Sequence, residues 1–150
     1  MKIQLESISN LVDELEPLIT LHWEQIELNQ DKIKLKPDWD QYKAIDKLGM
    51  IRTYTVRDNT ELVGYFIAVY MKALHHADHV FASCDAIYIR PDKRKGSIGH
   101  KLIKYAEKDL AKIGVSMMTI NVKTHAPFDK LLNRLGFNFT EKIYTKYLGD

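Results

Sequence analysis

Residues 85–103 decide the fold, and they read Asp85-Ala-Ile-Tyr-Ile-Arg-Pro-Asp-Lys-Arg-Lys-Gly-Ser-Ile-Gly-His-Lys-Leu-Ile103. An apolar run that is typical of a strand ends at Pro91, and a basic, glycine-containing loop then opens directly into a helical pattern. A helix start offers unpaired backbone N–H groups and a positive dipole end, and small residues let an anion approach the backbone closely. The segment therefore predicts a phosphate site; a surface turn with solvated lysines is the alternative.

The loop matches neither of the two commonest phosphate-binding motifs. A P-loop would end in Gly-Lys-Ser/Thr and a dinucleotide fingerprint would read Gly-x-Gly-x-x-Gly, but residues 93–99 contain neither pattern. Lys93, Arg94 and Lys95 bring three consecutive positive charges to the loop. We expect a phosphate-bearing ligand, held by backbone N–H groups and by these charges.

Apolar residues at helical spacing predict four helices. Two lie within the first 49 residues, where Pro17 is expected to break or kink the first helix and Gly49 to end the second. A third helix follows the basic loop and ends at Gly114, and a short fourth helix occupies residues 127–135.

A hydrophobic period of two predicts strands between these helices. The predicted strands are 51–57, 62–71, 80–89, 116–122 and two more within 137–148. The first two form an antiparallel hairpin. The third is apolar on both faces apart from Ser83 and Asp85, so it belongs in the middle of the sheet. The chain is thus predicted to be a single α/β domain of the α+β kind, spanning 1–150.

Composition excludes several classes of protein. The chain has 150 residues, of which 45% are hydrophobic, with 22 Lys+Arg against 20 Asp+Glu and a single cysteine. A domain of this length buries a core without disulfides, and no apolar run approaches the roughly 20 residues of a membrane span. Cys84 and an amino terminus without an export signal predict a cytoplasmic protein that acts away from membranes. A net charge of +2 does not indicate nucleic acid as a partner.

The loop resembles the cofactor signature of the GNAT acyltransferase superfamily, Arg/Gln-x-x-Gly-x-Gly/Ala. Arg94-Lys-Gly-Ser-Ile-Gly99 matches it with one departure, because Ser97 replaces the first signature glycine. Ile87-Tyr-Ile-Arg-Pro-Asp92 and Leu135-Gly-Phe137 are further family-like features, and the order of elements agrees over nearly the whole chain. The narrower resemblance is to small GNAT proteins encoded in phage genomes, which would place this protein in an infected bacterial host.

The resemblance implies a GNAT fold with acetyl-CoA as co-substrate and no metal. That fold is a mixed, mostly antiparallel sheet of six to seven strands, flanked by about four helices and splayed between its fourth and fifth strands. The loop amides would hold the pyrophosphate, and the main chain of the fourth strand would pair with the pantetheine arm. The implied cofactor-binding residues are Ile87, Tyr88, Ile89, Arg94, Lys95, Gly96, Ser97, Ile98, Gly99, His100, Lys101 and His125.

Asp85 is the candidate general base. It is a carboxylate in an apolar strand, so burial is expected to raise its pKa toward the range useful for accepting a proton. The family would hold the acyl thioester near residues 85–87, where a backbone N–H stabilises the oxyanion as an amine attacks. A structural aspartate is the alternative. His79 is a second candidate base.

The sequence leaves several candidates for the general acid. Leu132 occupies the position at which many family members carry the tyrosine that protonates the thiolate, and His125 replaces a common asparagine. Tyr88, Tyr144 and His125 are candidate donors, and each is alternatively a packing or surface residue. Loss of the tyrosine is expected to slow the reaction, since a thiolate can take its proton from water.

Three other features have structural explanations. His75-His-Ala-Asp-His79 contains metal-ligand residue types but lacks zinc-site spacing, so we interpret it as a polar hairpin loop that alternatively contacts the acceptor. Cys84 is interpreted as a packed thiol. Trp23, Trp39 and Tyr42 lie in helices that wall the acceptor site in this family, either as core residues or as part of that site.

The leading hypothesis is an acetyl-CoA-dependent N-acetyltransferase that acts on a primary amine of a small molecule or a protein by direct attack in a ternary complex. A catalytically weak or inactive CoA-binding regulatory module with the same fold is the alternative. Nucleic-acid binding ranks last, because the basic residues lack interleaved aromatic side chains. A homodimer is compatible with the sequence.

Overall fold

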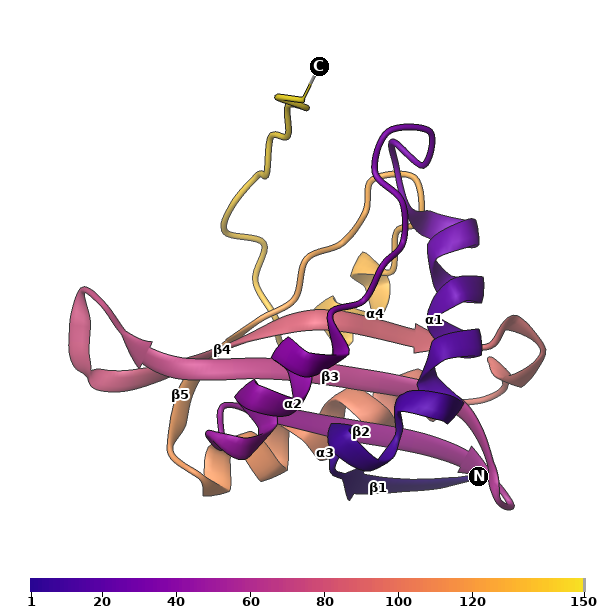
Figure 1. Cartoon of the computed structure of the whole chain (residues 1–150). Helices are drawn as coiled ribbons and strands as arrows, with labels where there is room; N and C mark the ends of the chain where they lie inside the picture. The colour runs from indigo at the N-terminus through magenta and orange to yellow at the C-terminus, as the bar shows by residue number, and fades with distance from the viewer. Residues whose placement is uncertain (150) are drawn as a thin grey trace.

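A computed structural model describes residues 1–149, and in this range the chain forms a five-stranded sheet with helices on both faces (Figure 1). The strands are β1 (Lys2–Glu6), β2 (Ile51–Asp58), β3 (Glu61–Ala73), β4 (His76–Ile89) and β5 (Val115–Thr119). They lie in the order β1-β2-β3-β4-β5; the first four are antiparallel, and β5 runs parallel to β4. The predicted α+β class and the mixed, mostly antiparallel sheet are confirmed.

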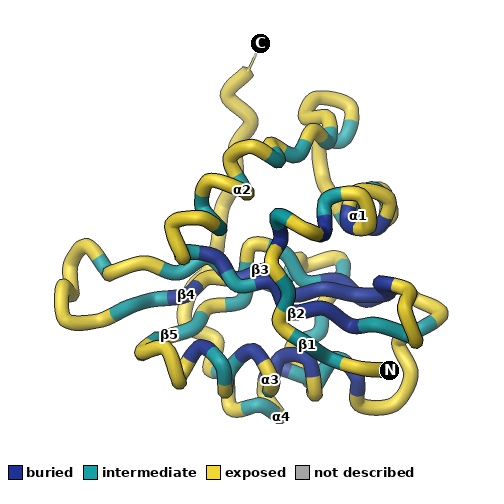
Figure 2. The backbone as a smooth tube through the Cα atoms, turned by 60° about the horizontal axis from the view of Figure 1, so that its bottom comes forward, coloured by how far each residue is buried: buried dark blue, intermediate teal, exposed yellow. Residues whose placement is uncertain are grey.

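The helices form one layer on each face of the sheet. They are α1 (Val12–Ile26), α2 (Trp39–Lys47), α3 (Ile98–Lys112) and α4 (Asp129–Arg134), with 3-10 turns at Ile8–Asn10 and Pro91–Lys93. Figure 2 shows α1 and α2 on one side of the sheet and α3 and α4 on the other. Pro17 does not interrupt α1. Asp38 caps α2 by accepting a hydrogen bond from the Gln41 N–H at 2.9 Å.

Each face of the sheet is buried by its own apolar cluster. Leu102, Ile103 and Leu110 of α3 pack against Tyr54, Phe66 and other side chains on one face. Leu11, Leu15 and Leu18, at the start of and within α1, pack against Tyr65, Ile67 and Tyr88 on the other. Two covered faces explain why β3 is apolar at nearly every position from Leu62 to Ala68.

The sequence analysis missed one strand and misplaced others. The first strand was missed, although Lys2-Ile-Gln-Leu-Glu6 alternates polar and apolar residues. Residues 137–149 contain no strand, which leaves five strands in the described part of the chain where six to seven were expected. The strand predicted at 116–122 ends at Thr119. The turn after β3 is only two residues long, so residues 76–79 belong to β4 rather than to a hairpin loop.

A bulge in β4 and an early end to β5 shape the middle of the sheet. Ala68 of β3 pairs with Cys84, and Ile67 pairs with Ala86, so Asp85 is an extra residue on β4. Pairing between β4 and β5 ends at Ser83 and Thr119. From Cys84 to Ile89 the outer edge of β4 therefore has no strand beside it among residues 1–149, and the expected splay between the fourth and fifth strands is confirmed.

Candidate active site

The unpaired edge of β4 is bordered by the segment that follows β5. This segment crosses to the carboxyl end of α1, where His125 Nε2–H donates to the Ile26 carbonyl at 2.7 Å and Lys123 pairs with Glu27 at 3.7 Å. His125, predicted to contact the cofactor, is exposed and its Nε2 is engaged with α1. The segment after β5 is thus attached to α1, while β4 has no partner strand on this side beyond Ser83 among residues 1–149.

The loop before α3 presents a row of free amides. Within the described chain, no protein group accepts a hydrogen bond from the five consecutive backbone N–H groups of Gly96, Ser97, Ile98, Gly99 and His100. Gly96 has a φ of +61°, which favours glycine, and Ser97 makes no side-chain cap. Orphan amides at the start of a 15-residue helix suit an anion, and they lie where the sequence analysis expects a phosphate.

The basic residues of the loop differ in what they contact. Lys93 pairs with Asp58, the last residue of β2, at 2.7 Å, so its charge is neutralised. Arg94 folds back over β4: its Nε donates to the Ile89 carbonyl at 2.6 Å, and its guanidinium carbon lies 5.4 Å from the Tyr88 ring centroid. Lys95 and Lys101 are exposed and pair with no carboxylate of residues 1–149.

Asp85 lies at the bulge, at one end of the unpaired edge. Tyr42 of α2 donates a hydrogen bond from its Oη to Asp85 Oδ2 at 2.5 Å. Burial, together with this hydrogen bond, raises the pKa of Tyr42, so its hydroxyl keeps its proton. The premise that Asp85 is buried was wrong, because the bulge and the departure of β5 leave this residue exposed. A carboxylate open to the splay is free to meet an incoming ammonium group.

A cluster centred on His22 was missed by the sequence analysis. His22 Nδ1 is hydrogen-bonded to the hydroxyl of the fully buried Tyr65 at 2.7 Å, and its ring stacks on Tyr88 with centroids 4.8 Å apart. Burial and the nearby charges of Arg94 and Lys123 lower the pKa of His22 to about 4, so the imidazole is neutral near pH 7.

The helical spacing contains a signal that could have identified His22. It continues the buried stripe Leu11, Leu15 and Leu18 of α1 by one further turn, and a histidine on such a stripe is held by a specific partner. Tyr88, a predicted cofactor contact, belongs to the same cluster and donates from its hydroxyl to Gln25 Oε1 at 3.1 Å.

Neither of the other two predicted catalytic residues is hydrogen-bonded to Asp85 within residues 1–149. His79 is six residues earlier on β4, roughly 20 Å along the strand at ~3.3 Å per residue, and its Nδ1 is hydrogen-bonded to Ser116 Oγ at 3.0 Å. Tyr144 is 88% exposed in the segment after α4. Leu132, which stands where many family members carry a tyrosine, is buried in the cluster beneath α3.

The cysteine and histidine candidates do not form a nucleophile or a metal centre. Burial, and then the Asp85 charge, raise the pKa of Cys84 to about 12, so it is a thiol near neutral pH. Among residues 1–149, no group of three His, Cys, Asp or Glu side chains is placed to hold a metal ion. In the same range no helix is long and apolar enough to cross a membrane.

Three solved structures share the fold of this chain at low sequence identity. An aminoglycoside acetyltransferase from an uncultured soil metagenomic sample, in complex with sisomicin, is 13% identical with a TM-score of 0.73 over 99% of this chain and 95% of that one. A ribosomal-protein-alanine N-acetyltransferase from Brucella melitensis biovar Abortus 2308 is 19% identical, with a TM-score of 0.72 over 99% and 100% of the two chains. A predicted acetyltransferase from Clostridium acetobutylicum, solved with acetyl-CoA, is 10% identical, with a TM-score of 0.75 over 98% and 96%. These likenesses support the fold alone.

Sequence comparison identifies the family. No curated protein sequence matches the chain significantly. One family model does match, over residues 15–137, a range that includes the loop before α3, the unpaired edge of β4 and Asp85. The match extends over most of the chain and agrees with the splayed sheet and the free amides. The chain therefore belongs to the Acetyltransferase (GNAT) family.

Proposed function

We propose that this protein is an acetyl-CoA-dependent N-acetyltransferase that moves an acetyl group to a primary amine by direct attack in a ternary complex. The observation that carries the proposal is the unpaired edge of β4 from Cys84 to Ile89, which connects the free amides of residues 96–100 with Asp85 at the bulge. An anion site and a carboxylate at opposite ends of an open strand edge match a cofactor with a pyrophosphate at one end and a reactive thioester at the other.

The residues present fit the cofactor. Its pyrophosphate would meet the five orphan amides of residues 96–100, with Lys95 and Lys101 adding charge. Its pantetheine arm would pair with the main chain at Ile87 and Ile89 beside the buried Tyr88, and His125 stands on the opposite border. Arg94 covers the Ile89 carbonyl, so its side chain has to turn away, which frees the guanidinium for a phosphate.

The chemistry needs one base and one oxyanion donor. Asp85 takes a proton from the ammonium group directly or through a water, and Tyr42 holds the carboxylate in place. The amine nitrogen then bonds to the thioester carbonyl carbon, and a main-chain N–H of residues 85–87 stabilises the oxyanion. As the oxyanion collapses, the carbon–sulfur bond breaks and the nitrogen, now bonded to the acetyl carbon, loses its second proton to solvent, which leaves a neutral amide. The departing thiolate takes its proton from solvent, since Leu132 has no proton to give. We assign no part in this step to His79, which is six residues from Asp85 along β4, or to Tyr144, which is exposed on the segment after α4.

The acceptor is an amine of a small molecule or of a protein. The similar structures include an aminoglycoside acetyltransferase and a ribosomal-protein-alanine N-acetyltransferase, so both classes occur on this fold. Trp39 and Tyr42, whose ring centroids are 5.6 Å apart, stand on the α2 side of Asp85. We propose that they contact the carbon skeleton of the acceptor. A cytoplasmic location and a phage-encoded origin stay predictions that rest on the single Cys84 and on the sequence resemblance.

A CoA-binding module with weak or no catalysis is the second candidate. It is favoured by Leu132, which leaves the thiolate without the tyrosine common in the family. Calorimetry with acetyl-CoA and a thiol-release assay separate the candidates. Binding with turnover on a panel of aminoglycosides and amino-terminal alanine peptides supports the enzyme, and binding without turnover on any amine supports the module. Absence of binding at about 1 mM acetyl-CoA would contradict both.

A matched pair of variants tests the anion site. Replacement of Lys95 and Lys101 by alanine is expected to weaken acetyl-CoA binding about tenfold, because two charges near the phosphates are lost. Replacement of Lys108 and Lys112 by alanine is the control. Both are exposed on α3 but far from its amino end, so acetyl-CoA binding is expected to stay unchanged. Equal effects of the two double variants would contradict a pyrophosphate at the loop.

A further inference from the structure

His22 of α1 has one ring nitrogen with a partner and one without. Its Nδ1 is hydrogen-bonded to the Tyr65 hydroxyl at 2.7 Å, while no group of residues 1–149 is hydrogen-bonded to its Nε2. The Nε2 atom is open to solvent, since among the described residues that are not exposed only Thr53 Oγ1 is a side-chain N or O atom both sealed from solvent and unpartnered. His22 therefore presents a polar atom that the chain itself does not use.

Tyr65 fixes which nitrogen of His22 carries the proton. Tyr65 is fully buried, and burial raises the pKa of its hydroxyl, so the O–H keeps its proton. Within the described chain, this O–H has no acceptor other than His22 Nδ1. Because a buried O–H without an acceptor is costly, the hydroxyl donates to Nδ1, and the proton of the neutral imidazole is on Nε2.

His22 lies between the two borders of the open edge of β4. Its ring stacks on Tyr88, which belongs to the unpaired segment of that strand. One helical turn after His22, the Ile26 carbonyl accepts a hydrogen bond from His125 on the opposite border. The free Nε2–H is thus available to a ligand that occupies the open edge.

A neutral donor at this place suits a carbonyl oxygen. Burial, and then the charges of Arg94 and Lys123, lower the pKa of His22 to about 4, so the ring is uncharged near pH 7. The phosphates of acetyl-CoA have the five free amides of residues 96–100. The ammonium group of an amine acceptor donates hydrogen bonds and accepts none. The amide carbonyls of the pantetheine arm, by contrast, need donors once they leave water.

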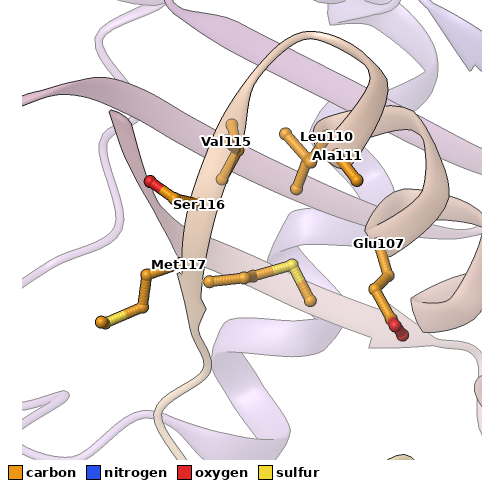
Figure 3. Close-up of a pocket in the computed structure, with 7 residues that line it drawn as sticks. Glu107, Leu110, Ala111, Val115, Ser116 and Met117 are labelled. Atoms are coloured by element: carbon orange, nitrogen blue, oxygen red, sulfur yellow. The ribbon is translucent and has the colours of Figure 1, made fainter. Parts of the chain in front are cut away.

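Another hollow of the molecule does not fit this arm. The pocket between α3 and β5 is lined mostly by apolar side chains, among them Leu110, Val115 and Met117 (Figure 3). Its volume is about 80 Å³, well below the roughly 300 Å³ at which pockets for small molecules begin. It also lies against α3, on the side of the sheet opposite to α1. The open edge of β4 is therefore the place for the arm.

We propose that His22 binds acetyl-CoA by donating a hydrogen bond from its Nε2 to a carbonyl oxygen of the pantetheine arm, and that Tyr65 is the positioning residue that holds the proton on Nε2. This inference rests on the proposed function, because it needs the cofactor in the open edge of β4. It gives the buried Tyr65 hydroxyl, which touches no part of that edge directly, an effect on cofactor binding through the tautomer of His22.

Nitrogen-15 NMR of the unmodified chain with labelled histidines tests both parts of the proposal. The His22 signals are identified by their loss in His22→Gln. At pH 7, an unprotonated Nδ1 and a protonated Nε2 are expected. Saturating coenzyme A is expected to shift the Nε2 resonance and to slow exchange of its proton with water.

The NMR outcomes separate this inference from the proposed function. A proton on Nδ1, or an Nε2 signal that bound coenzyme A leaves unchanged, would overturn the role of His22 and leave the proposed function intact. Absence of coenzyme A binding would contradict the proposed function and this inference together.

Matched double variants measure the hydrogen bond by calorimetry with acetyl-CoA. His22→Phe/Tyr65→Phe keeps a ring against Tyr88 and removes the donor without leaving a buried hydroxyl unpaired, so Kd is expected to rise about fivefold. His22→Gln/Tyr65→Phe keeps an N–H donor of similar reach and is expected to restore the unmodified Kd to within about twofold. Equal Kd values in the two double variants would overturn the proposal.

Two single variants are the controls for calorimetry. His76→Phe replaces an exposed histidine of β4, and Met117→Ala changes the pocket of Figure 3. Both are expected to leave the Kd of acetyl-CoA unchanged. Circular dichroism checks that each variant keeps the fold. The NMR experiment uses the unmodified chain, so it decides the proposal even if a double variant does not fold.

Discussion

The two faces of the sheet are both buried, but they differ in chemistry. Beneath α3, the buried side chains are almost wholly apolar, and Leu102, Ile103 and Ala106 have no exposed surface. Beneath α1 and α2, the cluster includes His22, Tyr65 and Tyr88 and ends at the Tyr42–Asp85 pair. Polar groups cost free energy when buried unless each finds a partner. The first face is therefore built for stability, and the second places polar groups around the open edge of β4.

The largest expected effect is on the apolar face. Leu102→Ala removes a fully buried side chain of α3 and leaves a cavity, so the free energy of unfolding is expected to fall by about 3 kcal/mol. Urea unfolding measures this change. Leu48→Ala, at a position 72% exposed, is the control and is expected to cost less than ~0.5 kcal/mol. A Leu102→Ala loss below ~1 kcal/mol would mean that this face collapses to fill the cavity and does not anchor the fold.

Asp85→Asn probes the chemistry at the edge of the other face. The amide keeps the shape and can accept the Tyr42 hydrogen bond, but it cannot take a proton, so kcat at neutral pH is expected to fall about 100-fold. Thiol release at saturating acetyl-CoA measures this change. Asp78→Asn, exposed near the start of the same strand, is the matched control and is expected to leave kcat unchanged. Unchanged turnover in Asp85→Asn would assign the base to another group.

His22 makes the stability of this face depend on pH. The folded protein protonates His22 only near pH 4, whereas the unfolded chain does so near the ordinary value of 6.5, so the unfolded state binds more protons between these values. The free energy of unfolding is therefore expected to fall by about 2 kcal/mol as the pH drops from 6.5 to 4. This figure is smaller than the full pKa shift implies, because solvent screens part of the interaction.

The His22 contribution is isolated by a variant. Urea midpoints of His22→Gln, measured at pH 7 and at pH 4.5, are expected to differ by less than those of the unmodified protein. His76→Gln, at an exposed histidine of β4, is the control and keeps the full dependence. Equal pH dependence in His22→Gln and the unmodified chain would show that the ring is protonated as readily in the folded state.

The smallest expected effect is at the Tyr42 hydroxyl. Tyr42→Phe removes one hydrogen bond to Asp85 while keeping the ring, which is expected to cost about 1 kcal/mol of stability. We also expect kcat to fall several-fold, because the carboxylate is less well positioned. Tyr105→Phe, whose hydroxyl has no partner within the described chain, is the control. Unchanged stability and kcat in Tyr42→Phe would show that the Tyr42–Asp85 hydrogen bond contributes to neither.

Much of the α3 side was predictable from local sequence. The strand before Pro91, the basic loop and the helix from Ile98 follow one another in the chain, and hydrophobic period, Pro and Gly signals act within a few residues. A helix start with small residues is visible in the same segment, so the free amides of residues 96–100 could be expected from local sequence. The α1 face was less predictable, since Tyr42 and Asp85 are 43 residues apart, as are His22 and Tyr65. No local pattern specifies such pairs.

The sequence by itself determined the α+β class, most strands and helices, the loop at 94–99 and its family resemblance, because each depends on spacing along the chain. Only the tertiary structure decided which groups are exposed and which are paired. It placed Asp85 in the open at a bulge, neutralised Lys93 with Asp58, and folded Arg94 onto the Ile89 carbonyl. It also left residues 137–149 without the strands that their composition favours. Burial of a side chain and its choice of partner depend on contacts between elements that are far apart in sequence. Local hydrophobic periodicity does not specify which elements come into contact.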